Sequence, residues 1–298
     1  MKQIEERYIS LLTDFGFKRI FGTAMNKDLL ICFLNSLFNG RQVVKDVSYL
    51  NPEHVGDVYT DRKAIFDVYC EGENGEKFIV EMQNAYQAYF KDRSLFYSTF
   101  PIREQAPKGN DWDFKLNHVY TVALLNFNMN EDAFDKEKIR HHVQLCDTAT
   151  HKIFYDKLEF IYVEIAKFNK TLEELETLYE KWLYALKNLY KLTQRPKELC
   201  DKVFDRLFEE AEIAKFTPQE MREYEASKMA YRDIKNSIDT AKQEGLAEGM
   251  EKGMKKGMEK GMNQKALDIA RNMLADSVDI NLIMKYSGLT QEQIEKLK

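Results

Sequence analysis

The sequence has few residues of the kinds that build disulfides, zinc sites or redox centres. Its four cysteines are scattered along 298 residues and form no CxxC pair: Cys32, Cys70, Cys146 and Cys200. This spacing excludes the usual zinc and thiol-redox motifs and predicts a protein without disulfides. Of the five histidines, His141 and His142 are adjacent, and neighbours on a strand point to opposite faces. We therefore expect that His141 and His142 do not bind one metal ion together.

Long hydrophobic runs and excess positive charge are also missing. No segment approaches the roughly 18 apolar residues of a membrane span, and the beginning, MKQIEERYISLLTDFGF, lacks the basic-then-apolar order of a signal peptide. We therefore expect a cytoplasmic protein with no membrane partner. The formal net charge of -5 argues against broad, charge-driven binding of nucleic acid. It does not exclude a nuclease that holds the phosphate through a metal ion.

The first half of the chain mixes helix and strand signals. We expect helices over 4–21, 26–38 and 85–105, a hairpin over 66–83, and a buried strand over 118–127. Alternating apolar residues over 141–165 predict two or three further strands in the same sheet. From about residue 171 the segments become amphipathic helices with charged outer faces, which indicates a helical extension.

A period-four repeat, GLAEGMEKGMKKGMEKGM, follows this extension. Its glycines recur at positions 245, 249, 253, 257 and 261, and a methionine follows each of the last four. Each glycine costs a helix about 1 kcal/mol relative to Ala, so a helix here needs close packing to offset that cost. The repeat is compatible with a flexible charged connector or with a helix that mediates self-association. After it, SGLTQEQIEKLK predicts a short capped helix that begins after Thr290.

The stretch FDVYCEGENGEKFIVEMQ, residues 66–83, carries polar residues where strands usually carry apolar ones. Glu81 and Gln83 are two apart and share a face. A two-residue turn at Asn74 and Gly75 pairs Asp67 with Met82, which puts the carboxylates of Asp67 and Glu81 on opposite faces. A three-residue loop with Gly75 in the left-handed conformation pairs Asp67 with Glu81 instead, and both loops are common.

With the longer loop, Asp67 and Glu81 lie about 5 Å apart at their Cβ atoms. Two carboxylates that close repel each other unless a cation lies between them. Mg²⁺ prefers one or two carboxylates together with waters and phosphate oxygens, and it activates a bound water for attack on a phosphodiester. Gln83 is placed to orient that water or a phosphate oxygen. The alternative is an exposed strand face that bears acids.

Four blocks of the sequence, in a fixed order, carry more information about the family than any single motif. TDFGFKRIF, NKDLLICFLNSLF, FDVYC…IVEMQ and FKDRSLFYSTF resemble the Rpn family of recombination-promoting nucleases, also described as transposases, within the PD-(D/E)XK superfamily. The resemblance covers roughly residues 10–130, and the Gly-rich tail ending in SGLTQEQIEKLK is similar to the tails of that family. It implies an α/β fold with a restriction-endonuclease-like mixed sheet of four or five strands flanked by helices, and a helical C-terminal extension.

The resemblance also implies roles for particular residues. Asp67 and Glu81 match the two metal-binding acids, and Gln83 stands where the superfamily usually has Lys, although ExQ is usual in the Rpn branch. Asp14 falls in the first-helix block, where an acid can complete the metal site, or it is an N-cap.

The helix that follows the hairpin carries a further pair. Arg93 and Tyr97 lie at i and i+4 and resemble a motif that contacts phosphate and supports the site. Arg93 would then restore the cation that Gln83 omits; the alternative is an Arg that packs over Tyr97. Lys18, also in a matched block, is expected in solvent.

From these patterns we predict four segments. They are a nuclease-like domain at 1–168, a helical extension at 169–243, the Gly/Met-rich repeat at 244–264 and short helices at 265–298. The predicted activity is that of an endodeoxyribonuclease dependent on Mg²⁺ or Mn²⁺, connected with recombination or mobile elements. The alternatives are a catalytically silent protein of the same fold that binds nucleic acid or assembles, and a nuclease that acts on RNA.

Overall fold

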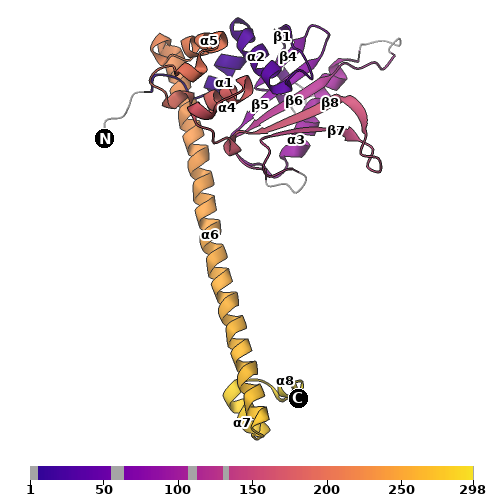
Figure 1. The fold of residues 1–298 in the computed structure, drawn as a ribbon, viewed down its shortest axis with the longest axis vertical. Helices are drawn as coiled ribbons and strands as arrows, with labels where there is room; N and C mark the ends of the chain where they lie inside the picture. Colours follow the sequence, from indigo (N-terminus) through magenta and orange to yellow (C-terminus); the bar gives the residue numbers. More distant parts are fainter. Residues whose placement is uncertain (1–5, 55–63, 107–112, 130–133, 298) are drawn as a thin grey trace. The chain divides into compact units, whose positions relative to one another are not determined.

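The computed structural model describes residues 6–54, 64–106, 113–129 and 134–297 (Figure 1). The chain divides into two compact units, Met1–Lys235 and Asn236–Lys298. The following paragraphs describe each unit by itself.

The first unit is built on a mixed sheet whose six strands run in the order β1-β4-β5-β6-β8-β7 (Figure 1). The strands are β1 Val47–Tyr49, β4 Val68–Gly72, β5 Lys77–Gln83, β6 Val119–Leu125, β7 Arg140–Cys146 and β8 Ile153–Glu164. The central β5-β6 and β6-β8 pairs are parallel, and the outer pairs are antiparallel. The fold is therefore the predicted mixed α/β sheet. It has more than the expected four or five strands because β1, at three residues, is too short to show a periodic pattern.

Two further short strands, β2 Glu53–His54 and β3 Ala64–Ile65, form a separate antiparallel pair. Short 3-10 helices connect several elements: Ala24–Asn26, Ile165–Lys167, Leu172–Glu174, Leu189–Lys191, Lys197–Leu199 and Ile213–Lys215.

Helices cover both faces of the sheet. On one side, the strands share a hydrophobic core with α1 Asp14–Phe21, α2 Lys27–Phe38, α4 Leu178–Asn188 and α5 Lys202–Glu210, and the last two pack against α2 (Figure 1). The other face packs against α3, Phe90–Glu104. Strand residues alternate between the two: Phe78 and Val80 of β5 join the core under α1 and α2, whereas Ile79 joins the cluster under α3. Glu81 has the parity of Ile79, and this alternation places it on the α3 side of the sheet.

The helix expected over 4–21 begins only at Asp14, so the prediction of its start was wrong. Thr13 is the N-cap, and its hydroxyl accepts a hydrogen bond from the amide of Gly16. The apolar residues before it are buried in a non-helical segment, where the Ile9 amide donates to the Ala211 carbonyl at 3.0 Å. Contacts with a distant part of the chain therefore override the local helical pattern. The helix expected over 85–105 likewise starts later, at Phe90.

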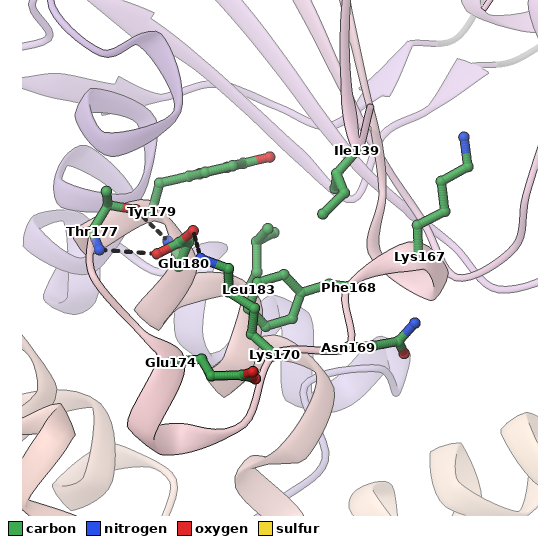
Figure 2. A pocket seen from close by; sticks show the side chains of 10 residues that line it. All are labelled: Ile139, Lys167, Phe168, Asn169, Lys170, Glu174, Thr177, Tyr179, Glu180 and Leu183. Atoms are coloured by element: carbon green, nitrogen blue, oxygen red, sulfur yellow. Dashed lines mark hydrogen bonds and ion pairs between the residues drawn. The ribbon is translucent and has the colours of Figure 1, made fainter. Parts of the chain in front are cut away.

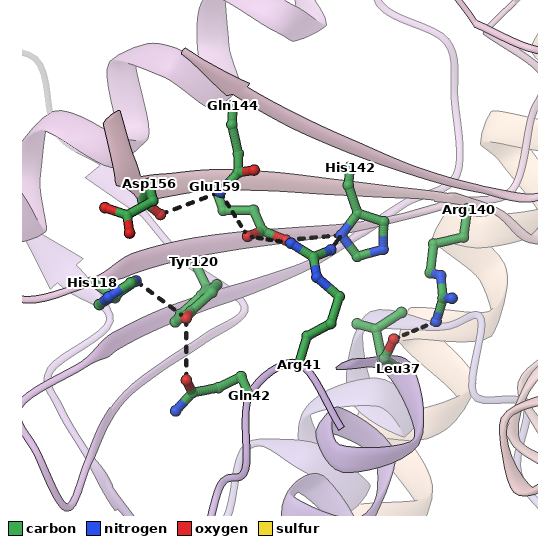
Figure 3. Close-up of polar contacts among 10 residues, drawn as sticks. All are labelled: Leu37, Arg41, Gln42, His118, Tyr120, Arg140, His142, Gln144, Asp156 and Glu159. Carbon is green, nitrogen blue, oxygen red and sulfur yellow. Dashed lines mark hydrogen bonds and ion pairs between the residues drawn. The ribbon is translucent and has the colours of Figure 1, made fainter. Parts of the chain in front are cut away.

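The two adjacent histidines lie on opposite faces of the sheet, as predicted. His141 is buried, stacks on Phe134 and lies 2.9 Å from Glu164 through its Nε2 atom. On the other face, His142 and Arg41 both contact the buried carboxylate of Glu159 (Figure 3). These contacts join the loop after α2 to the sheet. The polar residues there therefore have a structural role.

The second unit contains the greater part of α6, Pro218–Ala275, followed by α7, Ile280–Ser287, and α8, Gln291–Glu295. The last turns of α6 pack with α7 and α8 around a small core of Ala270, Ile283 and Ile294. Thr290 and Gln293 form a reciprocal capping box at the start of α8, which confirms the predicted helix start. Among the helices that the structure describes, none combines the length and apolarity needed to span a membrane.

The glycine repeat lies inside α6 and is helical throughout. A Cβ atom placed on any of its five glycines meets no heavy atom within 4 Å. The methionines that follow them are 66–77% exposed. Among the described residues, therefore, no packing contact offsets the helical cost of the glycines.

Candidate active site

The hairpin formed by β4 and β5 has the three-residue loop. The amide of Gly72 donates to the carbonyl of Glu76 at 2.8 Å, and Gly75 has φ +82°, the left-handed conformation. The register pairs Val68 with Val80 and Tyr69 with Ile79. Continued by one residue, it places Asp67 opposite Glu81. Of the two loops that the sequence allows, the structure has the one that brings the two acids to one site.

Direct hydrogen bonds join the two acidic residues to each other's strands. The amide of Asp67 donates to Glu81 Oε1 at 3.3 Å, and the amide of Met82 donates to Asp67 Oδ2 at 2.8 Å. The side chain of Glu81 is 8% exposed and that of Asp67 is 22% exposed. Both carboxylates are thus fixed at the start of β4 and near the end of β5, largely removed from water.

Burial shifts the proton equilibria of both acids in the same direction. It raises the pKa of Glu81 to about 8, and the negative charge of Asp67 adds to this shift while Arg93 opposes it. Burial also raises the pKa of Asp67, against the lowering effect of its hydrogen bond from Met82 and the charge of Lys18. Without further positive charge, the pair resists holding two negative charges.

Arg93 and Tyr97 of α3 meet this pair from the helix that covers the α3 side of the sheet. Arg93 Nη2 donates to Glu81 Oε2 at 3.1 Å, and its guanidinium carbon lies 5.2 Å from the centre of the Tyr97 ring. Tyr97 in turn packs edge-on against Phe66, the residue before Asp67. The position of Arg93 fits both interpretations from the sequence. It packs over Tyr97, and it contacts Glu81, a candidate metal-binding acid.

Gln83 is the next residue on β5 with the parity of Glu81. Its side-chain amide donates to the carbonyl of Ala85 at 3.0 Å. The oxygen of that amide is the atom available to accept a hydrogen bond from a water molecule.

Asp14 lies on α1, in the first turn, and Thr13 rather than Asp14 is the N-cap, so the N-cap interpretation was wrong. Its carboxylate is exposed and pairs with Lys18 at 2.6 Å. The Lys18 ammonium also lies 3.8 Å from Asp67 Oδ1, so this lysine connects the two acids and is not simply solvated. Asp14 is therefore close to the site but is separated from Asp67 by a cation.

The donor set fits a hard divalent cation. Among the described residues, no group of three or more His, Cys, Asp or Glu side chains is arranged to hold a metal ion. A pair of carboxylates can still hold an ion such as Mg²⁺, which takes one or two carboxylates and completes its shell with water and phosphate oxygens. Asp67 and Glu81, whose pKa values burial raises despite the neighbouring cations Lys18 and Arg93, would supply those two carboxylates.

A hollow of about 400 Å³ elsewhere in the first unit has a different character (Figure 2). Its acidic residues are already engaged in helix caps: Glu180 caps α4 with Thr177 and pairs with Lys170 at 2.5 Å, and Glu174 caps a 3-10 helix. The carboxylates here therefore have structural partners and are not arranged as a catalytic pair.

Comparison with protein families assigns the chain to a class. The chain matches the family described as PD-(D/E)XK nuclease family transposase over residues 11–241, and it belongs to that family. Residues 263–298 match the C-terminal helix-turn-helix domain of the Rpn/YhgA-like nuclease family, so the chain is an Rpn-type member with a helix-turn-helix domain at its C-terminal end. The resemblance deduced from the sequence is confirmed. No curated protein and no solved structure was found to be significantly similar to the chain.

The helix-turn-helix domain was missed in the analysis of the sequence. Residues 265–298 were expected to form short helices, and one of them was expected after Thr290, but no DNA-binding motif was recognised in them. The signal that was available is the turn SGLT between two short amphipathic helices, with a glycine at position 288.

Proposed function

We propose that the chain is an endodeoxyribonuclease that depends on Mg²⁺ or Mn²⁺ held by Asp67 and Glu81. The observation that carries the proposal is the pairing of these two buried acids across the β4–β5 hairpin, where one donates its amide to the other's carboxylate at 3.3 Å. Family membership supports nuclease chemistry, and the donor set supports a hard divalent cation.

Each residue near the pair has a role that follows from its contacts. The bound metal would lower the pKa of a water molecule and polarise the phosphate. Arg93, fixed by Glu81 and Tyr97, presents a cation where the superfamily usually has Lys, and it would bind a phosphate oxygen as negative charge develops. Gln83 would orient the attacking water through its amide oxygen. Asp14 would act through Lys18, which it holds near Asp67.

The C-terminal helix-turn-helix domain supports DNA as the partner. Such domains place their second helix in the major groove, and α7 and α8 are the two helices that follow α6. A DNA-binding domain joined to a nuclease domain fits a role in recombination or the movement of mobile elements. A dedicated DNA-binding domain is compatible with the acidic net charge, because binding through it does not need to depend on the charge of the whole chain.

Self-association would account for the glycine repeat. The five glycines leave a stripe on α6 that contacts no other part of the chain that the structure describes, and close approach of a second α6 helix would offset their cost. Two copies would bring two active sites to one DNA molecule, which suits cleavage of both strands.

Nicking of supercoiled plasmid tests the proposal. The purified protein is incubated with Mg²⁺, Mn²⁺ or Ca²⁺, or with EDTA, alongside Asp67→Ala and the control Glu71→Ala, whose carboxylate lies on the same hairpin and pairs with Lys77. The proposal predicts metal-dependent nicking by the wild type and by Glu71→Ala, and none by Asp67→Ala. No nicking by any form would support the catalytically silent protein instead, and equal nicking by Asp67→Ala would reject the assignment of the active site to Asp67 and Glu81. Parallel reactions with single-stranded DNA, RNA and duplex RNA distinguish DNA from RNA as the substrate.

A further inference from the structure

An open hollow of about 650 Å³ lies beside the candidate active site and is lined by residues at the beginning of α3 and just before it. Arg93 belongs to both places: it lines the hollow and donates to Glu81 Oε2 at 3.1 Å. A molecule held near the two acids through Arg93 would therefore extend into this hollow.

The hollow is lined by aromatic rings that remain exposed. Tyr89 is 78% exposed and Phe96 is 42% exposed, and both belong to the lining. Tyr89, Arg93 and Phe96 lie at i, i+4 and i+7, which is one face of the helix. Large exposed rings at helical spacing leave flat apolar surface in water, which suits a flat ligand that stacks.

The lining of the hollow carries one cation and one acid beside its rings. Arg93 is the cation on the side of Glu81, and Asp92 is an acid in the same lining. A phosphate is attracted to Arg93 and repelled by Asp92, whereas a neutral base is not repelled and can donate its amino group to that carboxylate. Rings, an acid and a cation in this arrangement match a nucleotide whose phosphate lies at the active site.

We propose that this hollow binds a nucleobase that is unstacked from its helix, with the base between Tyr89 and Phe96. A base inside a duplex is stacked on both sides and cannot reach such rings, so the preferred substrate is DNA with unpaired nucleotides next to the cleaved bond. This proposal rests on the proposed nuclease function, because it assigns the substrate class of that same site.

Fluorescence titration of the full-length protein tests the proposal. The probes are a duplex with a short single-stranded gap that carries 2-aminopurine, and the matched intact duplex, both in EDTA so that no cleavage occurs. The proposal predicts quenching and tighter binding with the gapped probe. Tyr89→Ala and Phe96→Ala each bind the gapped probe about tenfold more weakly, as expected from the loss of one base–aromatic stack. Tyr89→Phe, which keeps the ring, binds it as the wild type does.

Phe154→Ala is the matched control, since this residue is 82% exposed on β8 and does not line the hollow. Equal binding of both probes by the wild type, unchanged binding by the two Ala variants, or an equal loss in Phe154→Ala would overturn the proposal.

The plasmid assay keeps this inference separate from the proposed function. If Asp67→Ala stops cleavage while the Ala variants bind like the wild type, the nuclease stands and the base site is rejected. If Asp67→Ala cleaves normally, the assignment of the active site to Asp67 and Glu81 fails, and the base site that rests on it fails too. Weaker binding by Tyr89→Ala together with loss of cleavage in Asp67→Ala supports both.

Discussion

Arg93 and Glu81 are 12 residues apart in the sequence, and the guanidinium of one donates to the carboxylate of the other at 3.1 Å. This contact brings a cation from α3 to the strand that carries Gln83 in place of the lysine usual in the superfamily. We propose that this cation takes the place of the lysine that Gln83 replaces. Because the cation reaches the site from another element, its loss can be tested without changing the hairpin.

Removal of this cation should lower cleavage without unfolding the protein. Arg93→Ala leaves Glu81 buried without its closest positive charge, so we expect about 10- to 100-fold slower nicking, the range typical of residues that support a metal ligand. Arg93→Lys should recover part of the rate because it keeps the charge. The measurement is single-turnover nicking at saturating Mg²⁺. Equal rates for Arg93→Ala and the wild type would show that the arginine only packs over Tyr97.

The raised pKa of Glu81 predicts how the stability of the metal-free protein depends on pH. The folded state holds a proton on Glu81 up to about pH 8, whereas the unfolded chain releases it near pH 4.5. Between these values the folded state binds more protons, so the free energy of unfolding falls as pH rises from about 4.5 through 8. The protonated Glu81 makes its full contribution to the free energy of unfolding below pH 4.5, and a few kcal/mol of that contribution are lost by pH 9.

Urea unfolding in EDTA at a series of pH values measures this effect. Glu81→Gln should flatten the decline because it has no proton to release, whereas Glu71→Gln should keep it. Addition of Mg²⁺ at pH 8 should restore stability to the wild type by binding the ionised pair. The same slope in Glu81→Gln and the wild type would show that Glu81 does not titrate in this range.

Gly75 should be more sensitive to substitution than another glycine with the same backbone conformation. Gly75 and Gly40 have φ values of +82° and +81°, so alanine is strained at both. A Cβ atom at Gly75 lies 2.4 Å from Asn117 Nδ2, whereas one at Gly40 meets nothing within 4 Å. Both substitutions should lower the free energy of unfolding by about 1 kcal/mol from the backbone, and Gly75→Ala should lower it further. Equal losses in urea unfolding would contradict the packing described at the loop.

The hairpin shows how much of the site could be predicted from sequence. The residues Asp67, Glu81 and Gln83, and the face shared by the last two, follow from strand alternation. The register does not follow, because Asn74-Gly75 suits a two-residue turn as well as a three-residue loop. The choice depends on contacts outside the hairpin, including the packing of β5 against β6 and of the loop against Asn117.

Other differences have similar physical causes. The mixed sheet and most helices follow from apolar periodicity, but residues 6–13 have a helical pattern and pack instead against the segment around Ala211. Lys18 has no sequence feature that predicts its position between Asp14 and Asp67, since that depends on the packing of α1 against the sheet. Long-range contacts decide such positions, and local propensity does not contain them.

The glycine stripe of α6 gives a direct test of self-association. Replacement of Gly249, Gly253 and Gly257 by Ala should stabilise an isolated helix by about 1 kcal/mol per site. If two α6 helices pack through these glycines, the added methyl groups should instead weaken the assembly. We expect the wild type to sediment as a dimer and the triple variant to shift toward the monomer in analytical ultracentrifugation. A monomeric wild type, or a variant dimer of unchanged strength, would contradict self-association through this stripe.

The most direct test of the account compares plasmid nicking by Glu81→Gln and Glu71→Gln over a range of Mg²⁺ concentrations. The two substitutions remove one charge each from the same hairpin with almost no change in shape. The account predicts that Glu81→Gln loses at least about a hundredfold in nicking rate, more than a supporting residue would, while Glu71→Gln stays close to the wild type. Similar rates for both variants, whether high or low, would contradict the assignment of Asp67 and Glu81 as the catalytic pair.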